Sequence, residues 1–224
     1  MRRLILAREK INQINNKKGV IRFNYYPLFF LRQSIKENFY WSFYMAKERN
    51  KGKIFEDDFK KSVPTDCVCH RLKDSPLTYI KCDSAAYTHD NPCDFFVFDG
   101  SHGKLFTLEL KSTKSLAFTV QMSDDEPKKM IKYHQIKSLT ELSEYPNVVS
   151  GFLFNFRDEK ENTEECYFMF ITDFNAMMID IDKKSCNKTD IIEHGAIPVE
   201  GKLLRTHYRW DIKELFYYCS YINV

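Results

Sequence analysis

Two acidic residues and a lysine lie at the ends of two consecutive apolar stretches, where they could take part in chemistry. Asp94 opens the apolar run that reaches Phe98, and Glu109 and Lys111 lie near the end of the next run. Alternate side chains of a strand point to the same face, so a strand here places Glu109 beside Lys111. Two carboxylates that converge repel each other unless a cation lies between them.

Magnesium suits such a pair because it prefers oxygen ligands, usually one or two carboxylates with water and phosphate. Lys111 would then lie near the attacking water and the phosphoryl oxygens, where it can stabilise developing negative charge. The set therefore predicts metal-dependent hydrolysis of a phosphodiester, with Mg²⁺ as the cofactor and Mn²⁺ as an alternative. A Glu-x-Lys pair is also common as a plain ion pair on an exposed strand, so its context decides between the two interpretations.

The elements before and around these residues follow from hydrophobic periodicity. Residues 54–62 are expected to form a short amphipathic helix that ends before Pro64. Residues 67–72 alternate weakly and favour a strand. The runs 94–98 and 104–111 are strand-like, and the Asp99-Gly100 pair and Gly103 between them predict an antiparallel hairpin.

The second half of the chain continues the alternation of helices and strands. Residues 114–121 are expected to form a loop or a short strand, and residues 126–145 a helix with Pro127 in its first turn. Strands are predicted at 148–156 and 165–171, followed by a short helix capped by Thr172 or Asp173. The last segment, 205–222, has helical spacing. This order predicts an α/β fold with a mixed central sheet flanked by helices.

Gln135 interrupts an apolar stripe on the predicted helix. It is four residues from Ile131 and four from Leu139, so it should face the interior with them. A buried polar side chain needs a hydrogen-bond partner, which makes Gln135 a candidate neighbour of the acidic pair.

The first 44 residues differ from the rest. They hold nine Lys and Arg against two Glu in a chain of net charge +3, and they are rich in aromatic residues. Met45 begins a polar segment that resembles a natural N-terminus. Two interpretations stay open: residues 1–44 precede the true start of a domain spanning 45–224, or they form a basic arm that contacts DNA.

The seven cysteines show no Cys-x-x-Cys spacing, and no apolar run approaches the length of a membrane span. The expectation is a cytoplasmic protein with free thiols and no membrane partner. A zinc site built from Cys67, Cys69, Cys82 and Cys93 is an alternative with spacings unlike known zinc motifs.

Four segments in order resemble RecU-type Holliday-junction resolvases of the PD-(D/E)xK nuclease superfamily. They are Asn50–Glu56, Pro92–Phe95, Phe106–Lys114 and His134–Ile136. The resemblance covers roughly residues 47–216, with a looser match through Arg205 to Ile212. It implies a restriction-endonuclease-like core in a homodimer that nicks four-way DNA junctions, in DNA recombination and repair.

The resemblance also implies roles for individual residues. Asp94 and Glu109 would bind the metal, with the carbonyl of Leu110 as a further ligand, and Lys111 would be the catalytic lysine. Gln135 would lie beside them, and so would Glu56, unless Glu56 is only a surface charge of the first helix. Basic residues that could contact DNA phosphates are Arg71, Lys73, Lys128 and Lys132.

One departure from the family concerns the DNA structure being cut. RecU-type enzymes have a stalk between their early strands, whereas the segment between Cys69 and Asn91 is short and holds Pro76. Three alternatives therefore stay open: another PD-(D/E)xK nuclease of restriction or repair type, a non-catalytic DNA-binding recombination protein, and the zinc-stabilised module.

Overall fold

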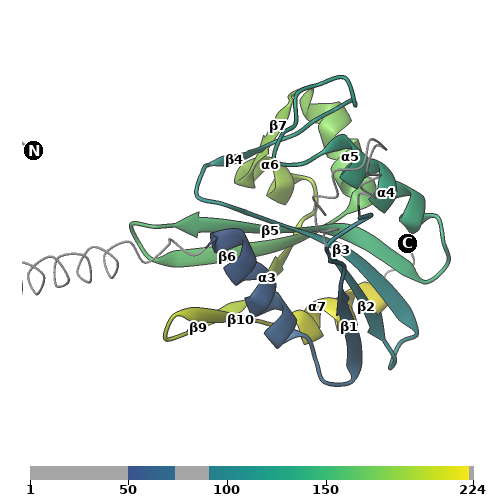
Figure 1. Cartoon of the computed structure of the whole chain (residues 1–224), viewed down its shortest axis with the longest axis vertical. Coiled ribbons are helices and arrows are strands. Elements are labelled where there is room, and N and C mark those ends of the chain that lie inside the picture. Colours follow the sequence, from purple (N-terminus) through teal and green to yellow (C-terminus); the bar gives the residue numbers. More distant parts are fainter. Residues whose placement is uncertain (1–49, 74–90, 222–224) are drawn as a thin grey trace, which may run out of the picture. The chain divides into compact units, whose positions relative to one another are not determined.

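The computed structural model describes residues 50–73 and 91–221, which belong to one compact unit. The expectations for residues 1–44 and Met45, and for most of the segment before Asn91, lie outside the described residues. Elements carry the labels of Figure 1.

A six-stranded mixed sheet forms the centre of this unit, in the order β1-β2-β3-β5-β6-β8. Its strands are β1 (Cys67–Arg71), β2 (Phe95–Asp99), β3 (Lys104–Thr113), β5 (Val148–Asp158), β6 (Thr163–Phe170) and β8 (Ile197–Val199). The β3–β5 pair is parallel, and the other neighbours are antiparallel. The predicted α/β fold with a mixed central sheet flanked by helices is confirmed.

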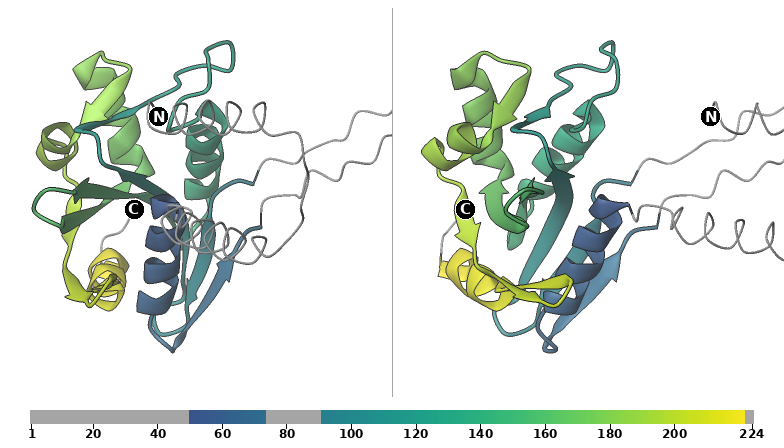
Figure 2. Two further views of the ribbon diagram at one scale, coloured as in Figure 1. Left: turned by 60° about the vertical axis from the view of Figure 1, so that its left-hand side comes forward. Right: turned by 90° about the vertical axis from the view of Figure 1, so that its left-hand side faces the viewer.

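Helices cover both faces of the sheet, as Figures 1 and 2 show. They are α3 (Lys51–Ser62), α4 (Tyr133–Ser143), α5 (Ile171–Ile181), α6 (Lys188–Glu193) and α7 (Ile212–Tyr221). Phe55 and Phe59 of α3 and Phe216 of α7 belong to one core with Leu108 and Leu110 of β3. The helices α4, α5 and α6 share a second core with β5 on the other face. Two strand pairs complete the fold: β4 (Ala117–Thr119) with β7 (Ser185–Asn187), and β9 (Gly201–Leu204) with β10 (His207–Trp210). No described helix is long and apolar enough to cross a membrane.

The predicted β2–β3 hairpin is confirmed, and its turn depends on two residues. Asp99 Oδ1 accepts a hydrogen bond of 2.9 Å from the amide of Ser101. Gly103 has a φ of 64°, a left-handed conformation that glycine adopts without steric cost. The turn therefore fixes the register that pairs Phe95 with Leu108.

Two predicted helix starts are wrong. The helix expected from residue 126 begins at Tyr133, because Ile131 instead forms a β-bridge with Val120 and is fully buried there. The helix expected near Asp173 begins at Ile171, and its N-cap, Phe170, makes no side-chain capping bond. At Ile131, a tertiary contact overrides the local helix signal.

Gly151 on β5 lies where the neighbouring strand leaves no room for a side chain. A Cβ at this position would collide with the carbonyl oxygen of Met169 and the ring of Phe168. We expect Gly151→Ala to lower the free energy of unfolding by about 2 kcal/mol through overpacking. Urea denaturation measures this, with Gly100→Ala as the control, since the nearest atom there is 3.8 Å away. Equal stability of the two variants would contradict the prediction.

Candidate active site

The hairpin brings Asp94 and Glu109 to the same end of the sheet. The amide of Asp94 donates to the carbonyl of Leu108 at 3.1 Å, so Asp94 continues the β2–β3 ladder one step beyond Phe95. Asp94 Oδ2 accepts a hydrogen bond of 2.9 Å from the amide of Leu110. The two acidic side chains therefore meet where β2 begins and β3 nears its end.

Glu109 and Lys111 lie on the face of β3 that α4 covers. They pair in register with Phe152 and Phe154 of β5, which belong to the core on that side. Lys111 Nζ is 2.9 Å from Glu109 Oε1, and their side chains are only 13% and 3% exposed. The sequence expectation that these two side chains share a face is met by the structure.

Gln135 of α4 connects the two charged groups. Its Nε2 donates to Glu109 Oε1, and its Oε1 accepts a hydrogen bond of 2.9 Å from Lys111 Nζ. The same oxygen accepts a 3.0 Å bond from the amide of Lys132, which ties the side chain to the first turn of its own helix. Gln135 therefore has the partners that its buried position required, and it holds Glu109 and Lys111 in a fixed relation.

Burial sets the electrostatics of both carboxyl groups. It raises the pKa of Glu109 to about 7, against the opposing effect of Lys111, and Asp94 adds to the rise. Burial also raises the pKa of Asp94, while the Leu110 amide and Lys111 act in the opposite direction. Both carboxylates are thus costly to ionise in the free protein, and a bound cation would offset that cost.

Glu56 and Arg71 form an ion pair close to Asp94. Arg71 Nε lies 2.6 Å from Glu56 Oε2, and both residues act electrostatically on the Asp94 carboxyl. Within residues 50–73 and 91–221, no three His, Cys, Asp or Glu side chains gather to form a metal site. Asp94 and Glu109 are two carboxylates that could hold a metal here, a number that Mg²⁺ accepts when water and phosphate complete its shell. Leu110, the further ligand suggested by the resemblance, lies between Glu109 and Lys111.

The basic residues predicted to contact DNA lie in different settings. Lys73 and Lys128 are exposed, and Lys132 is half-buried at the N-cap of α4, where its charge acts on Glu109. Lys128 precedes α4, because the helix begins at Tyr133 and not at residue 126 as expected. Arg71 is engaged with Glu56.

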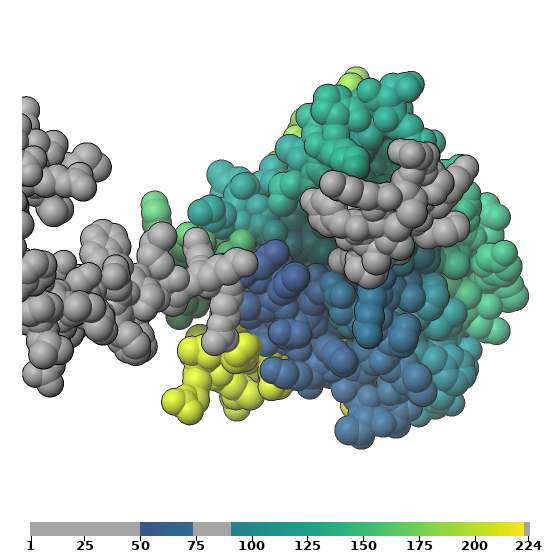
Figure 3. All heavy atoms as spheres, in the orientation of Figure 1, coloured from purple at the N-terminus to yellow at the C-terminus, as the bar shows by residue number. Residues whose placement is uncertain are grey.

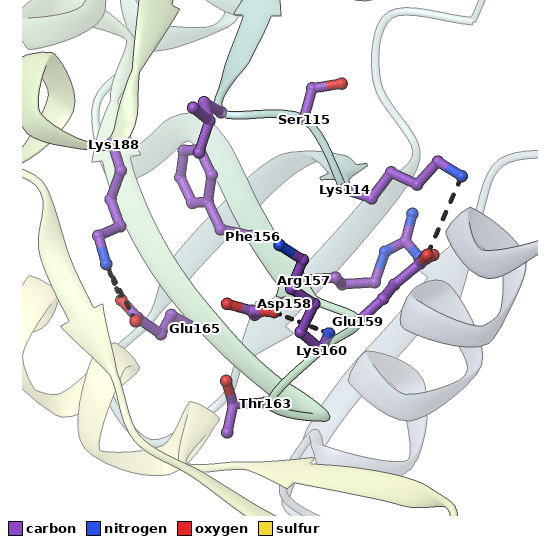
Figure 4. Close-up of a pocket in the computed structure, with 11 residues that line it drawn as sticks. Lys114, Ser115, Phe156, Arg157, Asp158, Glu159, Lys160, Thr163, Glu165 and Lys188 are labelled. Carbon is purple, nitrogen blue, oxygen red and sulfur yellow. Dashed lines mark hydrogen bonds and ion pairs between the residues drawn. The ribbon is translucent and has the colours of Figure 1, made fainter.

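A cavity of about 520 Å³, with several charged residues in its lining, lies at the C-terminal ends of β3 and β5 (Figure 4), and no sequence motif indicated it. Arg157 contributes to its wall, with Nε donating to Ser112 Oγ at 3.0 Å. Its cations have acidic neighbours: Lys188 lies 2.7 Å from Glu165, and Arg157 lies 3.5 Å from Glu159. Neither Asp94 nor Glu109 lines this cavity. Charges of both signs lie along the β5–β6 turn, and that mixture gave no signal of a site.

Comparison with known proteins gives one curated relative of unknown role. No model of a known protein family matches the sequence. Over 126 residues the chain is 40% identical to the SPbeta prophage-derived uncharacterized protein YotM of Bacillus subtilis (strain 168). The match covers 56% of this chain and 58% of the relative, so the chain spans less than two thirds of that protein.

A solved structure with a similar arrangement is Hjc, a Holliday junction resolvase of Archaeoglobus fulgidus. Its TM-score is 0.38 at 12% sequence identity, over 67% of this chain and 93% of that one. At this level of similarity, the resolvase structure does not define the activity of the chain.

Proposed function

We propose that the protein is a metal-dependent DNA endonuclease. The observation that carries the proposal is the buried contact between Glu109, Gln135 and Lys111, next to Asp94. Lys111 is held between the buried Glu109 carboxylate and the Gln135 amide, and Asp94 lies at the same end of the sheet. Burying these charged groups costs free energy, and folding stability alone does not explain that cost. Such arrangements are typical of sites that perform proton transfer or phosphoryl chemistry.

Each residue has a role in this proposal. Asp94 and Glu109 would hold a Mg²⁺ ion, which would supply activated water and charge neutralisation at the phosphate. Lys111 Nζ would donate to a phosphoryl oxygen or to the attacking water and stabilise the charge that develops there. Gln135 positions Lys111 and Glu109, and Glu56 and Arg71 tune the Asp94 carboxyl from α3 and β1.

The finer proposal is a homodimeric resolvase that nicks four-way junctions. It is supported by the sequence resemblance to RecU-type enzymes. Two-fold symmetry suits this substrate, because a junction is resolved by two symmetric nicks. Another nuclease of the same superfamily is the second candidate.

A substrate panel tests the proposal. The full chain is incubated with a four-way junction, a linear duplex of the same sequence and a flap, in Mg²⁺, in Mn²⁺ and in EDTA. We expect cleavage with either metal and none in EDTA, with the junction cut at least about tenfold faster than the duplex, a transition-state preference of about 1.4 kcal/mol. Equal rates on all three DNAs would contradict the resolvase proposal. No cleavage of any DNA would favour a binding protein.

A further inference from the structure

The β9–β10 hairpin is an exposed ribbon that is attached to α3 by hydrogen bonds to one buried side chain. All four residues of β9 are exposed, including Leu203 and Leu204 at 41% and 45%. Asp58 of α3, only 3% exposed, accepts from the amide of Tyr208 at 2.8 Å and contacts His207 Nδ1 at 2.7 Å. A buried carboxylate thus fastens a ribbon whose outer strand adds little to the core, which points to a role for the ribbon outside packing.

Cations dominate the ribbon itself. Residues 201–210 contain Lys202, Arg205, His207 and Arg209, and no acidic residue. Lys202 lies directly opposite Arg209 in the antiparallel register. Like charges at such positions destabilise a strand pair, because opposed Cβ atoms are only about 5 Å apart. Asp58 Oδ1 lies 4.0 Å from Arg209 Nη1 and offsets part of this repulsion, and an anion beside Lys202 would offset more of it.

The turn of the ribbon contains a residue in an unfavourable backbone conformation. Arg205 has a φ of 56°, in the left-handed region that favours glycine or asparagine. Its side chain is exposed. An arginine that keeps an unfavourable backbone conformation at an exposed tip is a candidate for a binding role.

Several acidic groups lie around the ribbon, and most are engaged. Glu164, whose amide donates to Tyr208 Oη at 3.1 Å, accepts a hydrogen bond from Asn155 Nδ2. Asp58 bonds to the hairpin as described, with its Oδ1 4.0 Å from Arg209 Nη1. Asp211 Oδ1 accepts from the amide of Glu214 at the start of α7. Glu200 and Asp211 border a cavity of about 440 Å³ at the base of the ribbon, together with Lys202 and Arg209. Glu200 and Asp211 therefore lie at the base beside Lys202, and Arg205 lies at the turn beyond them.

We infer that the β9–β10 hairpin, with Lys202 on β9 and Arg205 at its turn, binds the phosphodiester backbone of a nucleic-acid duplex. This inference rests on the proposed function and adds a contact surface to it. Helix α3 joins the two regions, since Glu56 lies near Asp94 while Asp58 holds the ribbon. Figure 3 shows the ribbon, in yellow, beside α3 on the same face of the molecule. A two-stranded ribbon with exposed leucines and cations is a known shape for contact with a DNA groove.

Binding without cleavage tests the inference. The dissociation constant for a 30-base-pair duplex is measured in EDTA by fluorescence anisotropy, across a series of salt concentrations. For Lys202→Gln with Arg205→Asn we expect a roughly tenfold weaker affinity and a salt slope reduced by about 2, one unit for each lost phosphate contact. The matched control is Lys183→Gln with Lys184→Gln, which removes two cations at the turn before β7 and should change the affinity less than about twofold.

Arg205→Asn alone is a second variant that is expected to fold normally, because asparagine tolerates the left-handed conformation better than arginine. We expect it to melt at or above the wild-type temperature and still to bind duplex more weakly. Unchanged affinity and salt slope in both hairpin variants, with a wild type that binds and cleaves DNA, would overturn the hairpin inference alone. A wild type that neither binds nor cleaves would overturn the proposed function and the inference with it. A wild type that binds DNA without cleaving it, with weaker binding by the hairpin variants, would support the hairpin and reject the nuclease.

Discussion

Glu109→Gln is expected to lower the rate of Mg²⁺-dependent DNA cleavage by about a thousandfold, or about 4 kcal/mol of activation free energy. The substitution keeps the shape of the side chain, and its oxygen can still accept from Gln135 and Lys111. It removes the negative charge that a Mg²⁺ ion at the proposed site would require. The loss therefore reports on charge at this position and not on packing.

The measurement is the single-turnover cleavage rate on the DNA that the wild type cuts fastest, at saturating Mg²⁺. Glu141→Gln is the matched control, since Glu141 is an exposed acid of α4 that pairs with Lys137 at 3.9 Å. It should cleave within about twofold of the wild type, as surface changes away from a site usually do. Cleavage by Glu109→Gln within tenfold of the wild type would remove this residue from the mechanism.

The same substitution is expected to stabilise the metal-free protein at high pH. Burial raises the pKa of Glu109 to about 7 in the folded state, above its ordinary value of 4.5. Between pH 4.5 and about pH 7, Glu109 is therefore protonated in the folded state and ionised in the unfolded state. Stability from this group is complete below pH 4.5, falls as the pH rises towards 7, and stays low above it. Glutamine does not titrate, so its variant avoids this loss.

We expect Glu109→Gln to exceed the wild type by about 1–3 kcal/mol in free energy of unfolding at pH 8 in EDTA, and to match it near pH 4.5. Saturating Mg²⁺ at pH 8 should stabilise the wild type and leave the variant unchanged. Urea denaturation at pH 5, 6.5 and 8 checks both expectations. Glu141→Gln should follow the wild type at every pH, and a Glu109→Gln variant that is less stable at pH 8 would contradict the argument.

Local sequence signals were sufficient for the part of the site that lies on one hairpin. The Asp99-Gly100 turn predicts the hairpin, and the period-two geometry of a strand places Glu109 and Lys111 on one face. The raised pKa of Glu109 was not accessible in this way, because it depends on Phe152, Phe154 and α4 closing over the strand.

The sequence failed where long-range contacts decide the backbone. Residues 126–132 contain good helix formers, yet Ile131 pairs with Val120 and delays the helix to Tyr133. The β9–β10 hairpin was missed because its turn holds Arg205 in place of glycine, and residues after it were assigned to the final helix. Contacts with Asp58, 149 and 150 positions away from its hairpin partners, fix that ribbon.

The parallel pairing of β3 with β5 divides the candidate site into an early and a late half during folding. Asp94, Glu109 and Lys111 meet through a hairpin, whose ends are close along the chain. Gln135 belongs to the crossover that must close before Leu105 can pair with Val148. Closing a loop of this length costs more entropy than forming the hairpin. We therefore expect Asp94, Glu109 and Lys111 to come together early in folding. Gln135, which fixes their geometry, joins them only when the sheet is completed.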